Sequence, residues 1–176
     1  MNQILISSLK GRDQLSITMV CLGNICRSPM AAAVLAGKTA DWKVPSIQVH
    51  SSGTGSWHIG QGPHPSSQKI WEAAGYKHSH IAQQFKVNDF FIHDLILVMD
   101  SSNYHNVLSL AESEEHRSKV FYLRNFDPDL KSIDPTSAEY FKLEVPDPYN
   151  QSDEAYETTL AMVERAVNGL LLELAR

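Results

Sequence analysis

The stretch ITMVCLGNICRSPMAAAVL, residues 17–35, decides the fold. Its first part, residues 17–21, is a short apolar run that predicts a buried strand. Ser28 followed by Pro29 is typical of a helix start, because a proline in the first turn gives up no hydrogen bond that the helix needs. Only a tight loop fits between them. The stretch therefore predicts a strand, a loop and a helix in direct succession.

The same alternation continues along the chain. Apolar runs at residues 47–51, 95–99 and 120–123 predict three further strands. The run at 95–99 has no polar alternation, as expected when both faces of a sheet are covered. Helices are predicted at residues 66–74, 101–110 and from about 152 to 174. Alternating strands and helices imply a parallel sheet covered on both sides, hence a three-layer α/β domain.

The size and composition indicate one globular domain. The chain has 176 residues, of which 43% are hydrophobic and 20% are charged. We place the domain at residues 15–176. Residues 1–14 are polar and aperiodic apart from Ile4-Leu5-Ile6, and we expect a flexible N-terminal extension there.

Charge and cysteine content restrict the partners and the compartment. A net charge of −5 without a run of Lys or Arg argues against nucleic acid as a partner. No stretch approaches the ~20 apolar residues of a membrane span, and the N-terminus lacks the basic flank of a signal peptide. The two cysteines, Cys21 and Cys26, are too few and too close for a secreted disulfide scaffold. We therefore expect a cytoplasmic protein that binds neither nucleic acid nor membrane.

Residues 21–27, the Cys21 loop, have the composition of a site for a phosphate dianion. Backbone N–H groups of such a loop can point inward, and the helix that follows adds its positive end. In an open α/β sheet this loop lies at the carboxyl ends of the strands, where ligands bind. It lacks the Gly-Lys-Ser/Thr of a nucleotide-binding loop, and it begins with Cys21 and ends with Arg27.

Cys21 and Arg27 point to phosphate transfer without a metal or other cofactor. Inward amides, a helix N-terminus and a guanidinium favour the thiolate of Cys21, which is the attacking form. Arg27 can hold two phosphate oxygens at once, also in the transition state. The plainer interpretation is that Cys21 ends a core strand and Arg27 is solvated, since a bare Cys-x5-Arg often occurs by chance. Its position between a strand and a helix start favours the catalytic interpretation.

The reaction also needs a carboxylic acid, which protonates the leaving group and later deprotonates a water molecule. The long aperiodic segment between Leu123 and Ser152 holds three Asp-Pro pairs, which begin at Asp127, Asp134 and Asp147. Irregular segments of this length are usually functional or disordered. The residues alone do not decide which aspartate is the acid.

The loop and its surroundings resemble the low-molecular-weight protein tyrosine phosphatase family. The resemblance covers nearly everything after residue 15, and its motifs are VCLGNICRSP at 20–29, Ser51, the Trp57 region, Ser79-His80, LILVMDSSN at 95–103 and Asp147-Pro148-Tyr149. It implies a flavodoxin-like fold with a four-stranded parallel sheet. It also implies that phosphotyrosine is hydrolysed through a phosphocysteine on Cys21, and that Asp147 is the general acid and base, because the family's acid precedes Pro-Tyr.

The resemblance assigns further roles around the loop. Residues that contact the phosphate would be Leu22, Gly23, Asn24, Ile25, Cys26 and Ser28. Asn24, Ser28, Ser51 and His80 would form the hydrogen-bond network that supports the loop. The alternative is that Asn24 is a turn residue and Ser28 a helix cap. Leu22, Ile25, Trp57 and Tyr149 would wall the pocket for the phenyl ring. The alternative for Trp57, a core aromatic, is weakened by Gly55, Ser56 and Gly60 around it.

Three positions depart from the family pattern. Asn150 follows Tyr149 where many members carry a second aromatic residue, and His64-Pro65-Ser66 replaces a frequent Asp-Pro-Arg. The N-terminus is also longer than usual. His78 and His80 form a His-x-His pair, but no third ligand lies nearby, so we expect no metal. Cys26 lies close enough in sequence to condense with an oxidised Cys21, which predicts a redox role.

Three other functions are compatible with parts of this sequence. Arsenate reductases of this fold use further cysteines downstream, and none follows Cys26. Protein arginine phosphatases carry Thr at the position of Ile25, which here favours an aromatic ring. An inactive binding module would be expected to lose Cys21, Arg27 or Asp147. The expected partners are proteins that carry phosphotyrosine, and the resemblance to bacterial members adds a tyrosine kinase.

Overall fold

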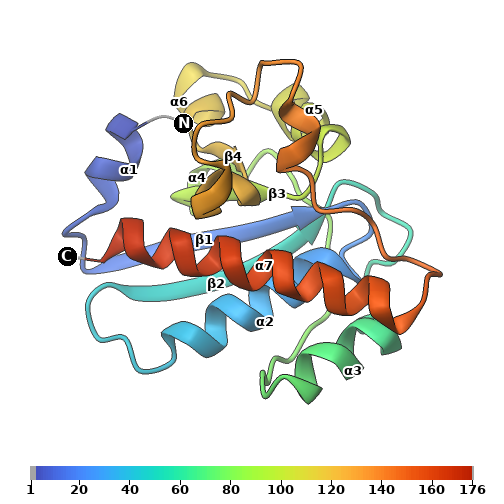
Figure 1. Ribbon diagram of the computed structural model, residues 1–176. Coiled ribbons are helices and arrows are strands. Elements are labelled where there is room, and N and C mark those ends of the chain that lie inside the picture. Colours follow the sequence, from blue (N-terminus) through green and yellow to red (C-terminus); the bar gives the residue numbers. More distant parts are fainter. Residues whose placement is uncertain (1–2, 176) are drawn as a thin grey trace.

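A computed structural model describes residues 3–175 and shows three layers (Figure 1). Within these residues the sheet consists of four parallel strands in the order β2-β1-β3-β4. Their bounds are Gln14–Cys21 for β1, Ser46–Gly53 for β2, Leu95–Val98 for β3 and Val120–Tyr122 for β4. The predicted α/β class, with a flavodoxin-like four-stranded parallel sheet, is confirmed.

Helices cover both faces of the sheet (Figure 1). On one face lie α2 (Arg27–Thr39), α3 (Pro65–Ala73) and α7 (Asp153–Leu174), which share the larger core with β1 residues such as Ile17 and Met19. On the other lie α4 (Asp89–Ile92) and α5 (Ser101–Ser109), which share a smaller core with Val20 and Ile96. Side chains of β1 alternate between the two cores, as the pleat of a strand requires. A short helix, α6 (Glu114–Ser118), precedes β4.

The prediction of a flexible N-terminal extension is wrong where the structure describes it. Gln3–Leu9 forms a helix, α1, that contacts α7. Ile6 and Leu9 are three positions apart, so they share one helix face, and each is only 1% exposed. Seven residues are too short a window for this pattern to be distinguished from a polar extension in the sequence. Residues 1 and 2 of the predicted extension lie outside the described residues.

The strand–loop–helix unit brings the Cys21 loop to the carboxyl edge of the sheet. β1 ends at Cys21 and α2 begins at Arg27, two residues before the Pro29 that marks its start in the sequence. Pro29 still lies in the first turn, where its missing N–H leaves no bond unmade.

The irregular segment before α7 contains three 3₁₀ turns in the described chain. These are η1 (Leu123–Phe126), η2 (Pro128–Leu130) and η3 (Tyr140–Leu143). Val145 N donates to Met99 O at 2.7 Å, so the end of this segment lies beside the end of β3. None of the helices in the described part of the chain is long and apolar enough to cross a membrane.

Candidate active site

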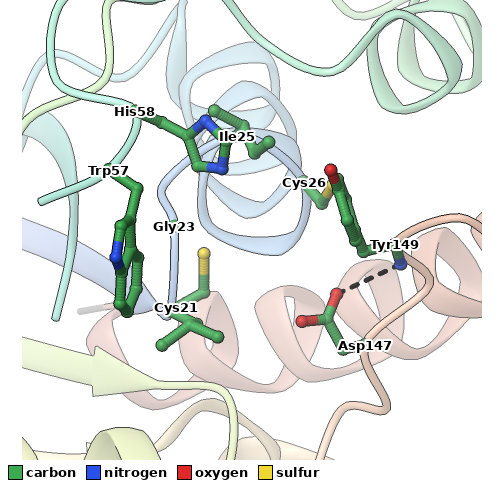
Figure 2. Close-up of a pocket in the computed structure, with 9 residues that line it drawn as sticks. Cys21, Gly23, Ile25, Cys26, Trp57, His58, Asp147 and Tyr149 are labelled. Atoms are coloured by element: carbon green, nitrogen blue, oxygen red, sulfur yellow. Dashed lines mark hydrogen bonds between the residues drawn. The ribbon is translucent and has the colours of Figure 1, made fainter. Parts of the chain in front are cut away.

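A pocket of about 140 Å³ opens at the carboxyl end of β1 (Figure 2). It is lined by Cys21, Leu22, Gly23, Ile25, Cys26, Trp57, His58, Asp147 and Tyr149. The structure thus brings the four predicted wall residues together with Cys21 and Asp147. Trp57 and Tyr149 stand on opposite sides of Cys21 in Figure 2. Trp57 is 69% exposed, so it is no core aromatic in this chain.

Cys21 lies at the base of the pocket and is 2% exposed. Its Sγ accepts a hydrogen bond from Asn24 N at 3.3 Å, and Ser28 Oγ lies 3.0 Å away. A backbone amide and a hydroxyl thus lie within hydrogen-bond distance of this sulfur. The surroundings of Cys21 therefore suit a nucleophile.

Asn24 connects the predicted support residues to one another. Its φ of 56° is left-handed, which Asn tolerates better than most residues, and its Nδ2 donates to Ser28 Oγ at 2.8 Å and to Ser51 Oγ at 3.0 Å. His80 Nε2 donates to Asn24 O at 2.6 Å. Asn24 is therefore both the turn residue and the centre of the network, and the two interpretations left open by the sequence are compatible.

Burial lowers the pKa of His80, only partly offset by its bond to Asn24 O. The ring therefore serves as a neutral donor at neutral pH. Ser28 makes no cap hydrogen bond for α2; its hydroxyl is used at Cys21 and Asn24 instead. The same side chain that reads as a helix cap in the sequence thus belongs to the loop network.

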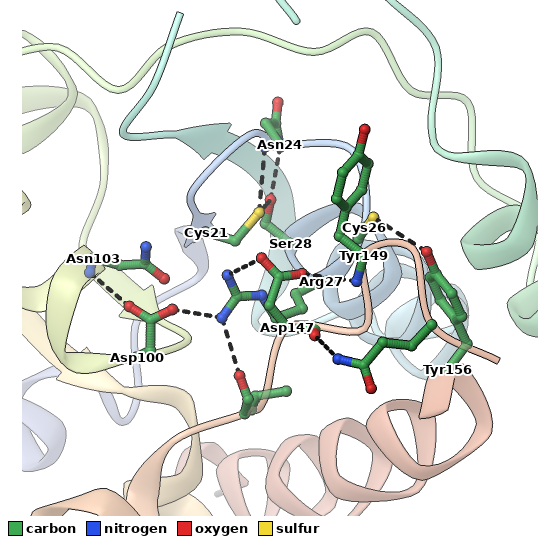
Figure 3. Close-up of polar contacts among 12 residues, drawn as sticks. Cys21, Asn24, Cys26, Arg27, Ser28, Asp100, Asn103, Asp147, Tyr149 and Tyr156 are labelled. Atoms are coloured by element: carbon green, nitrogen blue, oxygen red, sulfur yellow. Dashed lines mark hydrogen bonds and ion pairs between the residues drawn. The ribbon is translucent and has the colours of Figure 1, made fainter. Parts of the chain in front are cut away.

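Arg27 is 2% exposed and is held on one side by the protein (Figure 3). Nη1 donates to Asp100 Oδ2 at 2.6 Å and to Val145 O at 3.0 Å, and Nη2 donates to Asp147 Oδ2 at 2.9 Å. Burial would lower the pKa of Arg27, but the charges of Cys21, Asp147 and Asp100 outweigh burial and raise it. The guanidinium therefore stays charged.

The Nε donor of Arg27 makes no hydrogen bond within the described residues. This nitrogen is buried. Nε and Nη2 form one edge of the guanidinium fork, the edge that binds two oxygens of a phosphate. Because Nη1 is anchored by Asp100 and Val145, a ligand would bind at this edge, where it would compete with Asp147 for Nη2.

Of the three Asp-Pro pairs, the pocket contains the one that begins at Asp147. Asp127 is fully buried and accepts from Arg165 Nε at 2.9 Å. Asp134 accepts from Thr136 N and lies outside the pocket lining. Asp147 has a 40% exposed side chain, and its Oδ1 accepts from Tyr149 N at 3.2 Å. This placement agrees with the choice of Asp147 that the resemblance implies.

Cys26 lines the pocket at the start of α2, and Cys21 and Cys26 are both free thiols in the described structure. Its Sγ lies 3.8 Å from Tyr156 Oη, and burial raises the pKa of Cys26 to about 12. Ser67 Oγ donates to Cys26 O at 2.8 Å. Cys26 is therefore a protonated, buried neighbour of the candidate nucleophile.

Sequence reasoning missed several residues of the site. One of them is Asp100, which caps α5 by accepting from Asn103 N at 2.8 Å and holds Arg27 with its other oxygen. Its position directly after β3, at the carboxyl edge, was a usable signal. Gln83 N donates to Asn24 Oδ1 at 2.9 Å, and His58 lines the pocket beside Trp57. The carbonyl of Val145 left no signal at all.

Comparisons with known proteins agree with this geometry. The family model for low molecular weight phosphotyrosine protein phosphatase matches residues 16–176. A low molecular weight protein-tyrosine-phosphatase from Streptomyces coelicolor is 37% identical over 156 residues, which are 88% of this chain and 90% of that protein. PtpA, a protein of the same description from Staphylococcus aureus, is 35% identical over 159 residues, which are 86% of this chain and 91% of that protein.

Solved structures of similar proteins superpose on this chain over most of its length. A protein tyrosine phosphatase from Entamoeba histolytica superposes with a TM-score of 0.78 at 30% identity and covers 91% of this chain and 96% of its own. YfkJ from Bacillus subtilis superposes with a TM-score of 0.77 at 30% identity, with 92% and 95% covered.

The fold and the site define a class: an open parallel α/β domain with a cysteine–arginine loop at the carboxyl edge of its sheet. Within that class, the chain belongs to the low molecular weight phosphotyrosine protein phosphatase family, a family of hydrolases.

Proposed function

We propose that this protein hydrolyses phosphotyrosine in proteins through a phosphocysteine on Cys21, with Arg27 as the phosphate-binding residue and Asp147 as the general acid and base. One observation carries the proposal: Cys21 and Asp147 line one pocket, and Arg27 donates from Nη2 to Asp147 Oδ2 at 2.9 Å while its Nε has no partner among the described residues. These are a nucleophile, an anion clamp and a proton donor, which is the set that aryl phosphate hydrolysis requires.

The first step transfers phosphorus to sulfur. The phosphate dianion binds in the Cys21 loop, and the Nε–Nη2 edge of Arg27 donates to two of its oxygens. The thiolate of Cys21 attacks phosphorus, and the bond from phosphorus to the phenolic oxygen breaks. Protonated Asp147 gives its proton to that oxygen, so tyrosine leaves neutral.

The second step hydrolyses the phosphocysteine and regenerates the free enzyme. Asp147, now a carboxylate, takes a proton from water, and the resulting nucleophile attacks phosphorus. The bond from phosphorus to sulfur breaks, inorganic phosphate leaves and Cys21 is again a thiolate. The hydroxyl of Ser28, 3.0 Å from Sγ, stabilises this leaving thiolate. Arg27 and the loop amides carry the positive charge, so the mechanism has no step that needs a metal.

The pocket walls support an aromatic substrate. Leu22, Trp57 and Tyr149 are 40%, 69% and 47% exposed, although all three are large and apolar or aromatic. Ile25 continues this wall toward the base of the pocket and favours an aryl ring over the polar guanidine of phosphoarginine. A phenyl ring would cover these surfaces. We further propose that its partners are phosphotyrosine proteins in the cytoplasm. A bacterial tyrosine kinase would be among them, and this protein would reverse the phosphorylation that the kinase catalyses.

The test is hydrolysis of a chromogenic aryl phosphate by the parent protein and by Cys21→Ser, both with a chelator present. We expect the parent to turn over and the variant to fall to background while it keeps the melting temperature of the parent. Rapid quench and mass spectrometry of Asp147→Ala should then detect phosphate on Cys21. Activity in Cys21→Ser, or phosphate on another residue, would overturn the proposal.

A further inference from the structure

His64 lies just outside the pocket lining, yet it contacts both sides of the pocket. It is the residue before α3 and is partly buried. Its backbone binds the Cys21 loop, and its ring packs beside Tyr149. The proposed mechanism uses neither contact.

The backbone of His64 is fixed to the Cys21 loop. His64 N donates to Ile25 O at 2.8 Å. Three residues further along, Ser67 Oγ donates to Cys26 O at 2.8 Å. The start of α3 is thus bonded at two successive carbonyls of the loop, so His64 cannot shift without the pocket wall that Ile25 forms.

The ring of His64 is fixed as well. It stacks on Tyr156 with a centroid distance of 5.6 Å and an interplanar angle of 16°. Its Nδ1 accepts from Ser66 N at 3.3 Å and lies 3.2 Å from Tyr156 Oη. Tyr156 is fully buried in α7. The imidazole therefore has a set orientation before any substrate arrives.

Tyr149, in contrast, lies in an exposed turn, where its backbone N–H donates to Asp147 Oδ1 at 3.2 Å. Its side chain is 47% exposed, and Asn150 directly after it has a left-handed φ of 59°. The ring of His64 meets the ring of Tyr149 edge to face, with a centroid distance of 5.6 Å and an angle of 74°. This is a favoured geometry for an aromatic pair.

We propose that His64 is a positioning residue for the aromatic slot: it braces Tyr149 against the Ile25 side of the Cys21 loop and so sets the width of the slot that receives the phenyl ring. The inference rests on the proposed function and deepens it. His64 meets the Cys21 loop through its backbone N–H, which every side-chain substitution keeps. Its side chain therefore acts on the affinity for the ring of the substrate and not on the affinity for its phosphate.

The test separates ring from phosphate by direct binding. Benzylphosphonate carries both groups without being hydrolysed, and inorganic phosphate carries only one. His64→Asn keeps a side-chain oxygen for the cap of α3 but removes the ring, whereas His64→Phe keeps a ring and removes the acceptor. Calorimetry gives both dissociation constants for each protein, and melting curves check that the variants fold.

We expect His64→Asn to weaken benzylphosphonate binding by about threefold to tenfold, which is what an aromatic pair contributes. Binding of inorganic phosphate should change by less than about twofold, and His64→Phe should keep most of the affinity for benzylphosphonate. An equal loss for both ligands would overturn the inference, because it would mean that His64 acts on the Cys21 loop. Unchanged benzylphosphonate binding in His64→Asn would overturn it too.

A double-mutant cycle with Tyr149→Leu locates the effect. If His64 acts through Tyr149, His64→Asn should add almost nothing in the Tyr149→Leu background. Fully additive losses would contradict the proposal that His64 positions Tyr149.

The outcomes also separate this proposal from the proposed function. A parent that binds benzylphosphonate but hydrolyses no aryl phosphate overturns the proposed function and not the role of His64. An active parent in which His64→Asn has no effect on binding overturns the role of His64 alone.

Discussion

The guanidinium of Arg27 is paired with the carboxylate of Asp147, with Nη2 2.9 Å from Oδ2, although the residues are 120 positions apart (Figure 3). Nη2 belongs to the edge that an incoming phosphate would occupy. A bound dianion therefore competes with Asp147 for this donor. Release of Oδ2 from Arg27 would free the carboxyl group of Asp147 for the oxygen of the leaving group, as the proposed mechanism requires.

Asp147→Ala should affect substrates according to their leaving groups. Phosphotyrosine cleavage should slow by ~10²–10⁴-fold, because phenolate then leaves without a proton. An aryl phosphate with a strongly acidic phenol should lose far less in its phosphorylation step. Single-turnover kinetics measure that step directly. The matched control is Asp134→Ala, since Asp134 also precedes a proline but lies outside the pocket lining. If the phosphorylation rate falls equally with both esters, Asp147 is not the general acid.

Ile25→Thr should erode the preference for an aromatic ring. Ile25 is 8% exposed and lines the pocket, so the substitution replaces apolar wall by a hydroxyl. The kcat/KM for phosphotyrosine peptides should fall by about tenfold, as for a poorly filled apolar pocket. In the parent, phosphoserine peptides should be poor substrates, because their short stem does not reach Cys21 past the rim. Comparable kcat/KM for phosphoserine and phosphotyrosine peptides would contradict this account of the slot.

Much of this architecture could be predicted because the decisive signals are local. The strand, the loop and the helix start are contiguous around Cys21, and the alternation of elements prescribes a parallel sheet. Asn24 also carried a local signal, since Asn tolerates the left-handed conformation that it adopts. The family resemblance then singled out Asp147, which residue types alone did not distinguish from Asp127 and Asp134.

The missed features depend on contacts between distant segments. Arg27 meets Asp100 and the carbonyl of Val145 only because three loops converge at one edge of the sheet. A backbone carbonyl has no residue type that could announce this role. Helix α1 was missed for a related reason: Ile6 and Leu9 form an apolar face that becomes meaningful only when α7 is there to cover it.

Ile6→Ala should destabilise the protein. Ile6 is 1% exposed in the larger core, and truncation of such a side chain costs about 2–5 kcal/mol of the free energy of unfolding. The control is Ser7→Ala on the exposed side of α1, which should shift stability by less than ~0.5 kcal/mol. Urea unfolding of both variants measures the difference. A flexible extension predicts no effect of either substitution, so equal stabilities would mean that α1 does not pack on α7.

His93 should make the stability depend on pH. It is 6% exposed, and burial, aided by His50, lowers its pKa from 6.5 to about 4. Between these values the unfolded chain binds the proton and the folded chain does not, so the free energy of unfolding falls as the pH falls from about 6.5 to 4. The full difference is about 3 kcal/mol. Asp94 opposes the lowering of this pKa, and Lys119 adds to it.

Urea unfolding at several pH values between 7.5 and 4.5 tests the role of His93. His93→Gln keeps a polar partner for Ser16 Oγ, which lies 2.9 Å from Nδ1 in the parent. The variant should lose less stability than the parent as the pH falls. If the free energy of unfolding falls equally with pH in the two proteins, groups other than His93 cause the loss of stability in acid.

Cys26 should protect Cys21 from irreversible oxidation. Peroxide converts a thiolate to a sulfenic acid, which a second thiol can capture before further oxidation. Cys26 lies in the same pocket lining as Cys21. In the capture step its sulfur bonds to the sulfur of Cys21, and the sulfenic hydroxyl leaves as water with the proton of the Cys26 thiol. Because burial raises the pKa of Cys26 to about 12, that thiol is itself a poor target for peroxide and stays available.

The comparison is between the parent and Cys26→Ser, which keeps the size of the side chain and removes the second thiol. Each protein is treated with peroxide and then with dithiothreitol, and the recovered rate is expressed relative to its own rate before oxidation. The parent should recover most of its activity and the variant much less, because Cys21 then proceeds to the sulfinic acid that a thiol cannot reduce. Mass spectrometry of the oxidised parent should show a Cys21–Cys26 disulfide. The plainer role for Cys26, a small buried residue beside Tyr156, predicts equal recovery and no such linkage, and that result would end the protective interpretation.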